Sequence, residues 1–320
     1  HSQDLEKWNA QTSIQTVLSE LGEPLPNHYV NPNPELIKKG EEIVKYGRTT
    51  NEKGKLTRYV SKHYMCTTCH NLEQEDPDLR ISDPETRLPY VKSKGIPFLQ
   101  GTTFKGIVNR ESWYNDDYVK KYGDEKIEIA HKDLRESIQL CAVECSQGRT
   151  MEDWEIEAVL HYYWSLEFTL SDLDLTALDL EKLNQNRQDK SKKESTREWL
   201  KSFYNQKSPA HFYDAPKDKE KGYPYIIGDA KRGRDIYELS CLHCHKEGGV
   251  SHYILDNTEV SFRHLEQMIP KDSHFSLYQI IAYGTYALPG HKPYMPHYSK
   301  ERMSKQQVED LRAYIEMKAF

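Results

Sequence analysis

The hydrophobic residues of this chain recur at helical spacing near the end of each half of the sequence. Apolar positions three and four residues apart predict an amphipathic helix in both places. The two apolar faces consist of Ile156, Val159, Leu160 and Tyr163 in the first half and of Val308, Leu311, Tyr314 and Ile315 in the second. Aligning Met151 with Met303 places Tyr162 opposite Tyr314, so we interpret these helices as the last elements of an internal repeat.

Each half also begins with a short predicted helix that contains a glycine, Gly40 in the first and Gly233 in the second. We expect these glycines to let the first helix cross the last closely, because a missing side chain permits close approach of two backbones. Gly40 lies 26 residues before Cys66, whereas Gly233 lies 8 residues before Cys241. The first half therefore contains an insertion near residues 46–62, and it also has a longer stretch between its cysteine motif and its last helix.

The repeat divides the chain into four parts. We expect an N-terminal extension over residues 1–30, with a helix through Leu5–Leu21, then a domain over 31–170, a linker over 171–225 and a domain over 226–320. The linker is polar, and two interpretations stay open for it: a partly helical segment anchored on a domain, or a solvated spacer. The leucines that would anchor it are Leu173, Leu175, Leu178, Leu180 and Leu183.

Composition limits what the two domains can be. Apolar residues make up 37% of the 320 positions and the mean hydropathy is -0.86, so a large all-protein core is not expected. The net charge of -6 argues against a nucleic-acid partner. No segment approaches the roughly 18 consecutive apolar residues of a membrane span. The chain begins at His1 without an initiator methionine, so we expect a processed, mature form.

The sequence Cys-x-x-Cys-His occurs twice, at residues 66–70 and 241–245. This is the attachment motif of c-type haem, in which both thiols form thioethers and the histidine binds the iron. We therefore predict two covalent haem c groups, held by Cys66, Cys69 and His70 and by Cys241, Cys244 and His245. The alternatives are a zinc site or a redox dithiol, neither of which needs a histidine at both fifth positions.

With two haems, the pattern of helices resembles the cytochrome c fold. The expected architecture is all-α, with two cytochrome c-type haem domains joined by a long, partly helical linker. Haem is normally attached outside the cytoplasm, so we expect a periplasmic or other extracytoplasmic location. In such an oxidising compartment Cys141 and Cys145 could form a disulfide.

The sixth ligand of the second haem is predicted to be Met295, in Pro293-Tyr294-Met295-Pro296. A thioether ligand raises the reduction potential and suits electron transfer. Met295 could instead be a core residue, because methionine fills gaps readily. The rival methionines are Met268 and Met303, and His291 and His297 flank Met295 as further alternatives.

The first haem has no methionine available, since residues 71–149 contain none and Met151 lies too close to the last helix. Cys141 and His131 are the candidate sixth ligands. A thiolate ligand lowers the reduction potential, which favours a catalytic site over a simple electron carrier. Cys141 is the preferred ligand, and a disulfide with Cys145 is the alternative.

Residues 137–148, with Cys141, Cys145 and Ser146-Gln147-Gly148, are similar to the distal segment of di-haem thiosulfate dehydrogenases. They resemble more distantly the A subunit of the SoxAX cytochromes of sulfur oxidation. The resemblance implies that Cys141 ligates a catalytic haem and that Met295 ligates a haem through which electrons leave. The chain departs from the family pattern in having Ser137 where an arginine is usual and Cys145 where a serine is usual. Insertions near residues 46–62 and around residues 102–128 also exceed the usual length of the family.

The resemblance further implies a small anionic sulfur substrate, thiosulfate, oxidised to tetrathionate with release of two electrons. The acceptor would be a small soluble cytochrome or a membrane redox complex. A dianion needs fixed positive charge, and guanidinium groups bind oxyanions with forked donors. Arg110 and Arg149 are the candidates, with Arg135 third, although each could equally hold a haem propionate or lie on the surface.

Two other functions remain open at this point. One is a di-haem electron-transfer cytochrome, or a redox subunit without a substrate of its own. The other is a di-haem peroxidase, which is disfavoured because no distal acid–base pair is evident. The aromatic segment 113–118 could form a wall of the first haem pocket or be an ordinary packed insertion.

Overall fold

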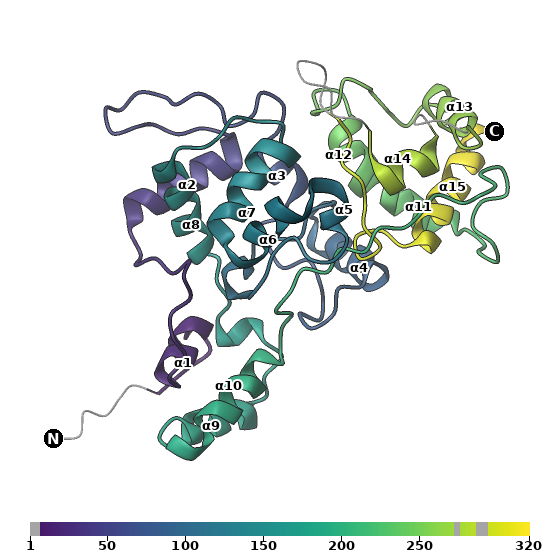
Figure 1. Cartoon of the computed structure of the whole chain (residues 1–320). Helices are drawn as coiled ribbons and strands as arrows, with labels where there is room; N and C mark the ends of the chain where they lie inside the picture. The colour runs from purple at the N-terminus through teal and green to yellow at the C-terminus, as the bar shows by residue number, and fades with distance from the viewer. Residues whose placement is uncertain (1–6, 272–275, 286–293) are drawn as a thin grey trace.

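The computed structural model describes residues 7–271, 276–285 and 294–320, and these form helices joined by loops (Figure 1). Two isolated β-bridges occur, and the described residues contain no strand beyond these. The predicted all-α fold is therefore confirmed. The α-helices are α1 (Ile14–Glu20), α2 (Pro34–Tyr46), α3 (Cys66–Cys69), α4 (Pro84–Lys94), α5 (Tyr118–Tyr122), α6 (Asp124–Lys132), α7 (Leu134–Leu140), α8 (Asp153–Trp164), α9 (Ala177–Asn186), α10 (Lys193–Lys201), α11 (Ala230–Ile236), α12 (Leu242–His245), α13 (Glu259–Met268), α14 (Leu277–Tyr283) and α15 (Lys305–Ala319).

Five shorter helical turns complete the set. Three are 3-10 turns, at Ile107–Asn109, Leu170–Asp172 and Lys190–Lys192. Two are π-helical turns, η2 (Cys141–Cys145) and η5 (Tyr237–Cys241). Single π-turns inside helical segments often mark functional sites. Here η2 carries the two unassigned cysteines, and η5 leads into the second Cys-x-x-Cys-His motif.

Two helix pairs cross closely at the predicted glycines. A Cβ atom at Gly40 would lie 1.9 Å from the carbonyl oxygen of Ala158, and one at Gly233 would lie 1.9 Å from that of Asp310. Any side chain at either glycine would therefore overlap the backbone of the facing helix. The pairs are α2 with α8 and α11 with α15, and the aromatic residues beside the glycines are Tyr162 and Tyr314. The expected close crossing is thus confirmed in both halves.

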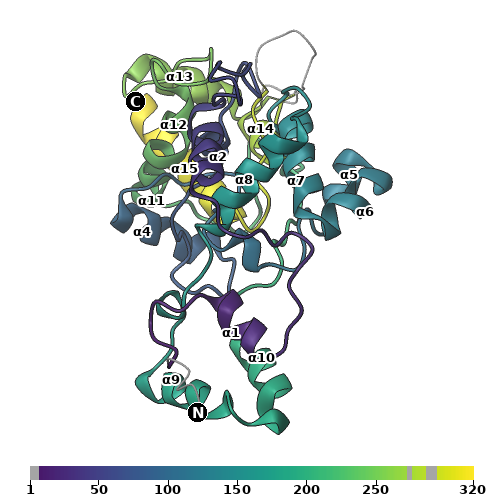
Figure 2. The same cartoon turned by 90° about the vertical axis from the view of Figure 1, so that its left-hand side faces the viewer.

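The N-terminal segment and the linker pack on each other, as the lower part of Figure 1 and Figure 2 show. Helix α1 packs with α9 and α10 around buried residues that include Leu18, Leu183 and Leu200. The predicted helix through Leu5–Leu21 is wrong at its start, because Ser13 caps the helix by accepting a hydrogen bond from Thr16 N and α1 begins at Ile14. Residues 1–6 lie outside the described part. Of the linker leucines, Leu173 and Leu183 are buried in this cluster, whereas Leu178 is 76% exposed.

Helix α4 belongs to the first half of the sequence but packs on the core of the second half. Leu88 and Val91 of α4, and Phe98 just after it, are buried in one cluster with residues of α11, α13, α14 and α15. The backbone N–H of Phe98 also donates to the carbonyl of Leu239 at 3.0 Å. The two halves are therefore joined by a packed apolar contact in addition to the linker.

A buried ion pair reinforces this junction. The guanidinium of Arg302, just before α15, binds both carboxylate oxygens of Glu75 at 2.7 and 3.0 Å. Arg87 of α4 is fully buried beside them and donates to the carbonyl oxygen of Leu99 at 3.1 Å. Burial would raise the pKa of Glu75, but the charges of Arg302 and Arg87 outweigh it and hold this pKa well below its usual value.

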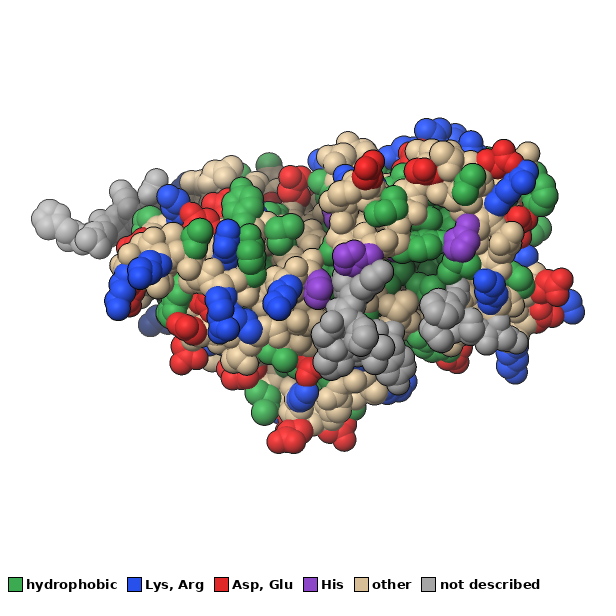
Figure 3. All heavy atoms as spheres, turned by 90° about the horizontal axis from the view of Figure 1, so that it is seen from above, with side chains coloured by type: hydrophobic (Ala, Val, Ile, Leu, Met, Phe, Trp, Pro, Cys, Tyr) green, Lys and Arg blue, Asp and Glu red, His purple; other side chains and the backbone are tan. Residues whose placement is uncertain are grey.

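The surface carries mixed charge. On the face drawn in Figure 3, basic and acidic side chains are interspersed over the visible part of the described chain. None of the described helices combines the length and the hydrophobicity needed to cross a lipid bilayer.

Candidate functional site

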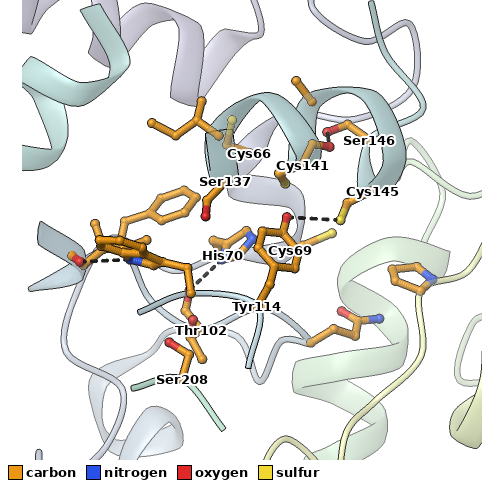
Figure 4. A pocket seen from close by; sticks show the side chains of 18 of the residues that line it. Cys66, Cys69, His70, Thr102, Tyr114, Ser137, Cys141, Cys145, Ser146 and Ser208 are labelled. Carbon is orange, nitrogen blue, oxygen red and sulfur yellow. Dashed lines mark hydrogen bonds between the residues drawn. The ribbon is translucent and has the colours of Figure 1, made fainter. Parts of the chain in front are cut away.

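A large cavity surrounds the first Cys-x-x-Cys-His motif. Its empty space is about 1460 Å³, including the part that opens to solvent. Cys66, Cys69 and His70 line it together with Cys141 and Cys145, which approach from η2 (Figure 4). Most of the remaining wall is apolar or aromatic and comes from α2, α7, α8 and the loops between them. No Asp or Glu occurs among the described residues that line the cavity.

His70 is held in an orientation suited to binding a metal. Its Nδ1 lies 2.5 Å from the carbonyl oxygen of Thr102, so Nδ1 carries the hydrogen and Nε2 keeps its lone pair. Burial lowers the pKa of His70 to about 4, which keeps the ring neutral. Gly101 packs against the ring, since a Cβ there would lie 2.5 Å from His70 Cε1.

His245 in the second motif has the same arrangement. Its Nδ1 lies 2.8 Å from the carbonyl oxygen of Tyr253, and burial again lowers its pKa. Cys241 and Cys244 lie at the end of η5 and on α12, and burial raises the pKa of both thiols. Both motifs therefore present two thiols and one histidine whose Nε2 is free. This donor set fits covalently attached haem c, because a second hydrogen-bond partner normally fixes the tautomer of a ligating histidine.

Cys141 and Cys145 are turned into the first cavity and are not joined by a disulfide (Figure 4). In the π-helical turn, Ser146 N donates to the carbonyl of Cys141 at 2.9 Å. The Cys145 sulfur lies 3.3 Å from the hydroxyl of Tyr122 and 3.6 Å from that of Tyr114. The contact with the Cys141 thiol and these two hydroxyls lower the pKa of Cys145, and the contact between the thiols raises the pKa of Cys141.

The structure separates the two candidate sixth ligands of the first haem. His131 does not line the cavity, and its Nδ1 lies 3.2 Å from the carbonyl oxygen of Trp113. Cys141 does line it, together with Cys66, Cys69 and His70. Position therefore favours Cys141 over His131. The aromatic segment 113–118 forms part of the wall, since Trp113, Tyr114 and Tyr118 line the cavity.

The three arginine candidates differ in position. Arg110 lines the cavity and donates to Thr102 Oγ1 at 3.2 Å and Ser208 Oγ at 2.5 Å, without a carboxylate partner among the described residues. Burial lowers its pKa to about 10. Arg149 does not line the cavity, because it forms a two-pronged ion pair with Glu155, both contacts at 2.7 Å. The catalytic role expected for Arg149 is therefore dropped, and Arg135, paired with Glu157, is likewise placed elsewhere.

Met295 lies beside the second core, and its role as the sixth ligand of a second haem stays a prediction. It packs against the apolar cluster of that half, and its backbone N–H donates to Thr285 Oγ1 at 2.6 Å. Met303 is buried in the same cluster, and Met268 Sδ accepts a hydrogen bond from Tyr253 at 3.7 Å. Pro293 and His291 lie outside the described residues.

The neighbours of Met295 face the other cavity. Tyr294 and His297 both line the first cavity, and the hydroxyl of Tyr294 donates to the carbonyl of Cys145 at 2.9 Å. His297, a sequence candidate for the second iron, is thus placed at the first cavity. One extended segment, residues 294–297, separates the two predicted haem sites.

Sequence reasoning missed several side chains of the first cavity, namely Lys121, Tyr122, Ser208, Tyr294 and Arg302. None of them stands in a recognisable motif. Lys121 and Tyr122 belong to the insertion at residues 102–128, Ser208 to the linker, and Tyr294 and Arg302 to the other half of the chain. Only the hydroxyl-rich and aromatic character of the insertion pointed toward this wall.

Comparison with known families agrees with the second half of this description. The family model described as cytochrome c oxidase, cbb3-type, subunit III matches residues 228–315. Neither the curated proteins nor the solved structures gave a match. The matched region contains Cys241, Cys244, His245 and Met295, and such a domain implies a covalently bound haem c. Residues 228–315 are thus a cytochrome c domain, which supports haem-based electron transfer.

Proposed function

We propose that the chain is a di-haem oxidoreductase that acts on a small sulfur oxyanion, with thiosulfate as substrate and tetrathionate as product. Cys66, Cys69 and His70 would hold the catalytic haem, with Cys141 as its sixth ligand. Cys241, Cys244, His245 and Met295 would hold the second haem, through which electrons leave. The observation that carries this proposal is the first cavity, where two thiols face the attachment motif and no carboxylate occurs among the described lining residues.

Charge in the cavity suits an anionic substrate. Arg110, Lys121 and Arg302 all line it, and only Arg302 is neutralised by a carboxylate, that of Glu75, within the described part of the chain. A guanidinium without a carboxylate partner in a largely apolar wall attracts an anion more strongly than the same group in water. Arg110 is the residue of this set that sequence reasoning anticipated.

The reaction balances without an added reagent other than the electron acceptor. Two thiosulfate dianions join through a new sulfur–sulfur bond to give one tetrathionate dianion, and two electrons are released. When bound, the two haems would supply one-electron acceptor sites, one for each of these electrons. The chain's own residues would bind the anions at cationic side chains and keep reactive sulfur away from bulk water.

A contact between the two attachment motifs supports such a transfer. The ring of His243, in the second motif, interacts with the backbone of Thr68 in the first. We place the protein in the periplasm, where c-type haem is attached. A small soluble cytochrome or a membrane redox complex would accept the electrons.

The first test is the low-temperature electron paramagnetic resonance spectrum of the oxidised protein, followed by a thiosulfate assay with an artificial acceptor. We expect one low-spin signal with the narrow g-spread of a His/thiolate haem beside one His/Met signal. Cys141→Ser should remove the narrow signal and the thiosulfate activity, whereas Cys145→Ser should keep the signal.

Two wide signals of nitrogen or thioether type would contradict the thiolate ligand. The chain would then be a di-haem electron-transfer cytochrome, and the cytochrome c domain at residues 228–315 supports the haem-based electron transfer in this alternative. Loss of the narrow signal in Cys145→Ser with its retention in Cys141→Ser would move the ligand to Cys145.

A further inference from the structure

Lys121 and His297 form a polar pair in the first cavity. Neither residue is a proposed haem ligand, and the pair is distinct from Arg110. Lys121 Nζ lies 3.1 Å from His297 Nδ1, and both residues line the cavity. Lys121 comes from α5, in the insertion of the first half, and His297 follows Met295 in the second half. The pair is therefore assembled only when both halves of the chain are present.

The contact with Lys121 determines which nitrogen of His297 carries the hydrogen. An ammonium group has donors and no acceptor, so Nδ1 of His297 must accept from Lys121. The neutral ring then carries its hydrogen on Nε2. His297 is 7% exposed, and its Nε2 is buried without a hydrogen-bond partner among the described residues. A buried N–H without an acceptor is costly, which indicates that a ligand atom fills this place.

The surroundings of the pair select for negative charge. Lys121 forms no ion pair with a carboxylate in the described part of the chain, and its ammonium lies over the rings of Tyr122 and Tyr294 at 5.4 and 5.7 Å. Phe212 and Tyr118 pack against the His297 ring at 4.5 and 6.0 Å. The aromatic rings lower the local dielectric constant on one side of the ammonium, which strengthens its attraction to an anion.

Position connects this pair to the sulfur chemistry. Lys121 Nζ lies over the ring of Tyr122, 5.4 Å from its centre, and the Tyr122 hydroxyl lies 3.3 Å from the Cys145 sulfur. Lys121 is itself exposed to solvent, which gives a dissolved anion access to its ammonium. An anion held here would therefore lie on the Cys145 side of the cavity, whereas Arg110 lies beside Thr102 and His70.

We propose that Lys121 and the Nε2–H of His297 form a binding site for one tetrahedral oxyanion, the sulfonate end of the sulfur substrate. The identity of this anion rests on the proposed function. Arg110 provides a second positive charge apart from Lys121. The cavity therefore has two positively charged positions for a reaction that joins two dianions. Lys121 and His297 are binding residues and supply no electron or proton to the reaction.

Calorimetric titration of the full-length, haem-loaded protein with sulfate tests the site, because sulfate is a tetrahedral dianion without redox chemistry here. Lys121→Met and His297→Phe should each weaken sulfate binding about tenfold, the effect of losing one hydrogen bond to a charged group. The same variants should raise the KM for thiosulfate more than they lower kcat. Lys120→Met is the matched control, because Lys120 is exposed and paired with Asp117, and it should bind sulfate like the unmodified chain.

The outcomes separate this inference from the proposed function. If the variants bind sulfate as the unmodified chain does, the site is overturned even when thiosulfate is oxidised. If sulfate affinity falls as expected but thiosulfate is not oxidised, the anion site stands and the proposed reaction fails. A shift in the first haem's reduction potential in Lys121→Met without added anion, with unchanged sulfate affinity, would show that the pair holds a haem propionate and overturns the inference.

Discussion

The sulfur of Cys145 receives hydrogen bonds from two tyrosine hydroxyls, whereas the sulfur of Cys141 has none from a tyrosine in the described part of the chain. Hydroxyl donors stabilise a thiolate more than a thiol, so they lower the pKa of Cys145. The Cys141 contact, Tyr122, Tyr114 and Lys121 together lower the pKa of Cys145 below its usual 9.0, against the effect of burial. Two cysteines four residues apart thus have different chemistry.

Removing the hydroxyls of Tyr114 and Tyr122 should raise the pKa of Cys145. We expect the Tyr114→Phe/Tyr122→Phe double variant to need a higher pH for half-maximal alkylation of Cys145 by iodoacetamide, since only the thiolate reacts. Mass spectrometry identifies the modified residue at each pH. Tyr118→Phe is the control, because Tyr118 stacks on Tyr122 at 6.0 Å without a hydrogen bond to the Cys145 sulfur. An unchanged alkylation profile in the double variant would show that the tyrosines do not set this pKa.

The sequence predicted the attachment cysteines and histidines because their chemistry requires a fixed local spacing. The absence of a methionine also made Cys141 a candidate ligand of the first haem, a role that stays a prediction, and the structure places Cys141 in the wall of the first cavity. The sequence did not show that Arg110 lines the cavity while Arg149 does not. Arg149 forms an ion pair with Glu155, and Glu155 is one of many carboxylates near it in the sequence. Lys121 and His297 could not be paired from the sequence, since 176 residues separate them.

At the scale of helices, each half depends on one crossing between its first and last helix. Burial of Gly40 against Ala158 and of Gly233 against Asp310 leaves no room for a methyl group. These crossings were predictable because a glycine inside a helical pattern weakens the helix and is usually kept there for close packing. The start of α1 was not predictable, because an apolar pattern extends beyond the residue that caps the helix.

Gly40→Ala and Gly233→Ala should each destabilise the chain by about 3 kcal/mol, the upper end for overpacking a buried contact, because the added carbon meets backbone. Guanidinium unfolding followed by haem absorption measures the free energy of unfolding. Lys38→Ala is the control on α2, because Lys38 lies away from the crossing and is at least partly exposed. A loss below about 1 kcal/mol in both glycine variants would mean that the helices can separate without cost.

At the scale of the whole molecule, the two halves are joined by a buried ion pair as well as by apolar packing. Glu75 comes from the first half and Arg302 from the second, and both side chains are almost fully buried. The folded pKa of Glu75 lies below its usual value of 4.5, so its contribution to stability is complete above pH 4.5. This contribution is lost progressively as the pH falls below 4.5 and the carboxylate is protonated.

We therefore expect the junction between the halves to loosen in acid before either half unfolds. Protection factors, which compare the measured exchange with the intrinsic rate at the same pH, should fall at residues 98–103 and 299–303 as the pH falls below 4.5, the usual pKa of this carboxyl, while those of α2, α8, α11 and α15 stay high. Glu75→Gln should show the faster exchange already at neutral pH. Equal exchange of the junction and of the four helices across this range would contradict the prediction.

Removing one partner of the pair should have a larger effect than acid. Arg302→Met leaves the buried Glu75 with Arg87, at 3.7 Å, as its one positively charged partner in the described part of the chain, and we expect a loss of about 3 kcal/mol in the free energy of unfolding. Lys300→Met, two residues earlier and exposed, should leave stability unchanged. Denaturant titration measures both. A stability equal to that of the control would mean that apolar packing alone holds the halves together.

Residues 294–297 contribute side chains to two places. Tyr294 and His297 line the first cavity, and Met295 packs against the second core. Haem domains are often regarded as exchangeable modules that evolution can recombine. In this chain the cytochrome c domain at residues 228–315 contributes part of the wall of the first cavity. A recombination that replaced residues 228–315 with another cytochrome domain would bring in a haem but remove the tyrosine, histidine and arginine that complete its neighbour. Where both halves line the first cavity, we therefore expect a substitution in one half to require a matching substitution in the other.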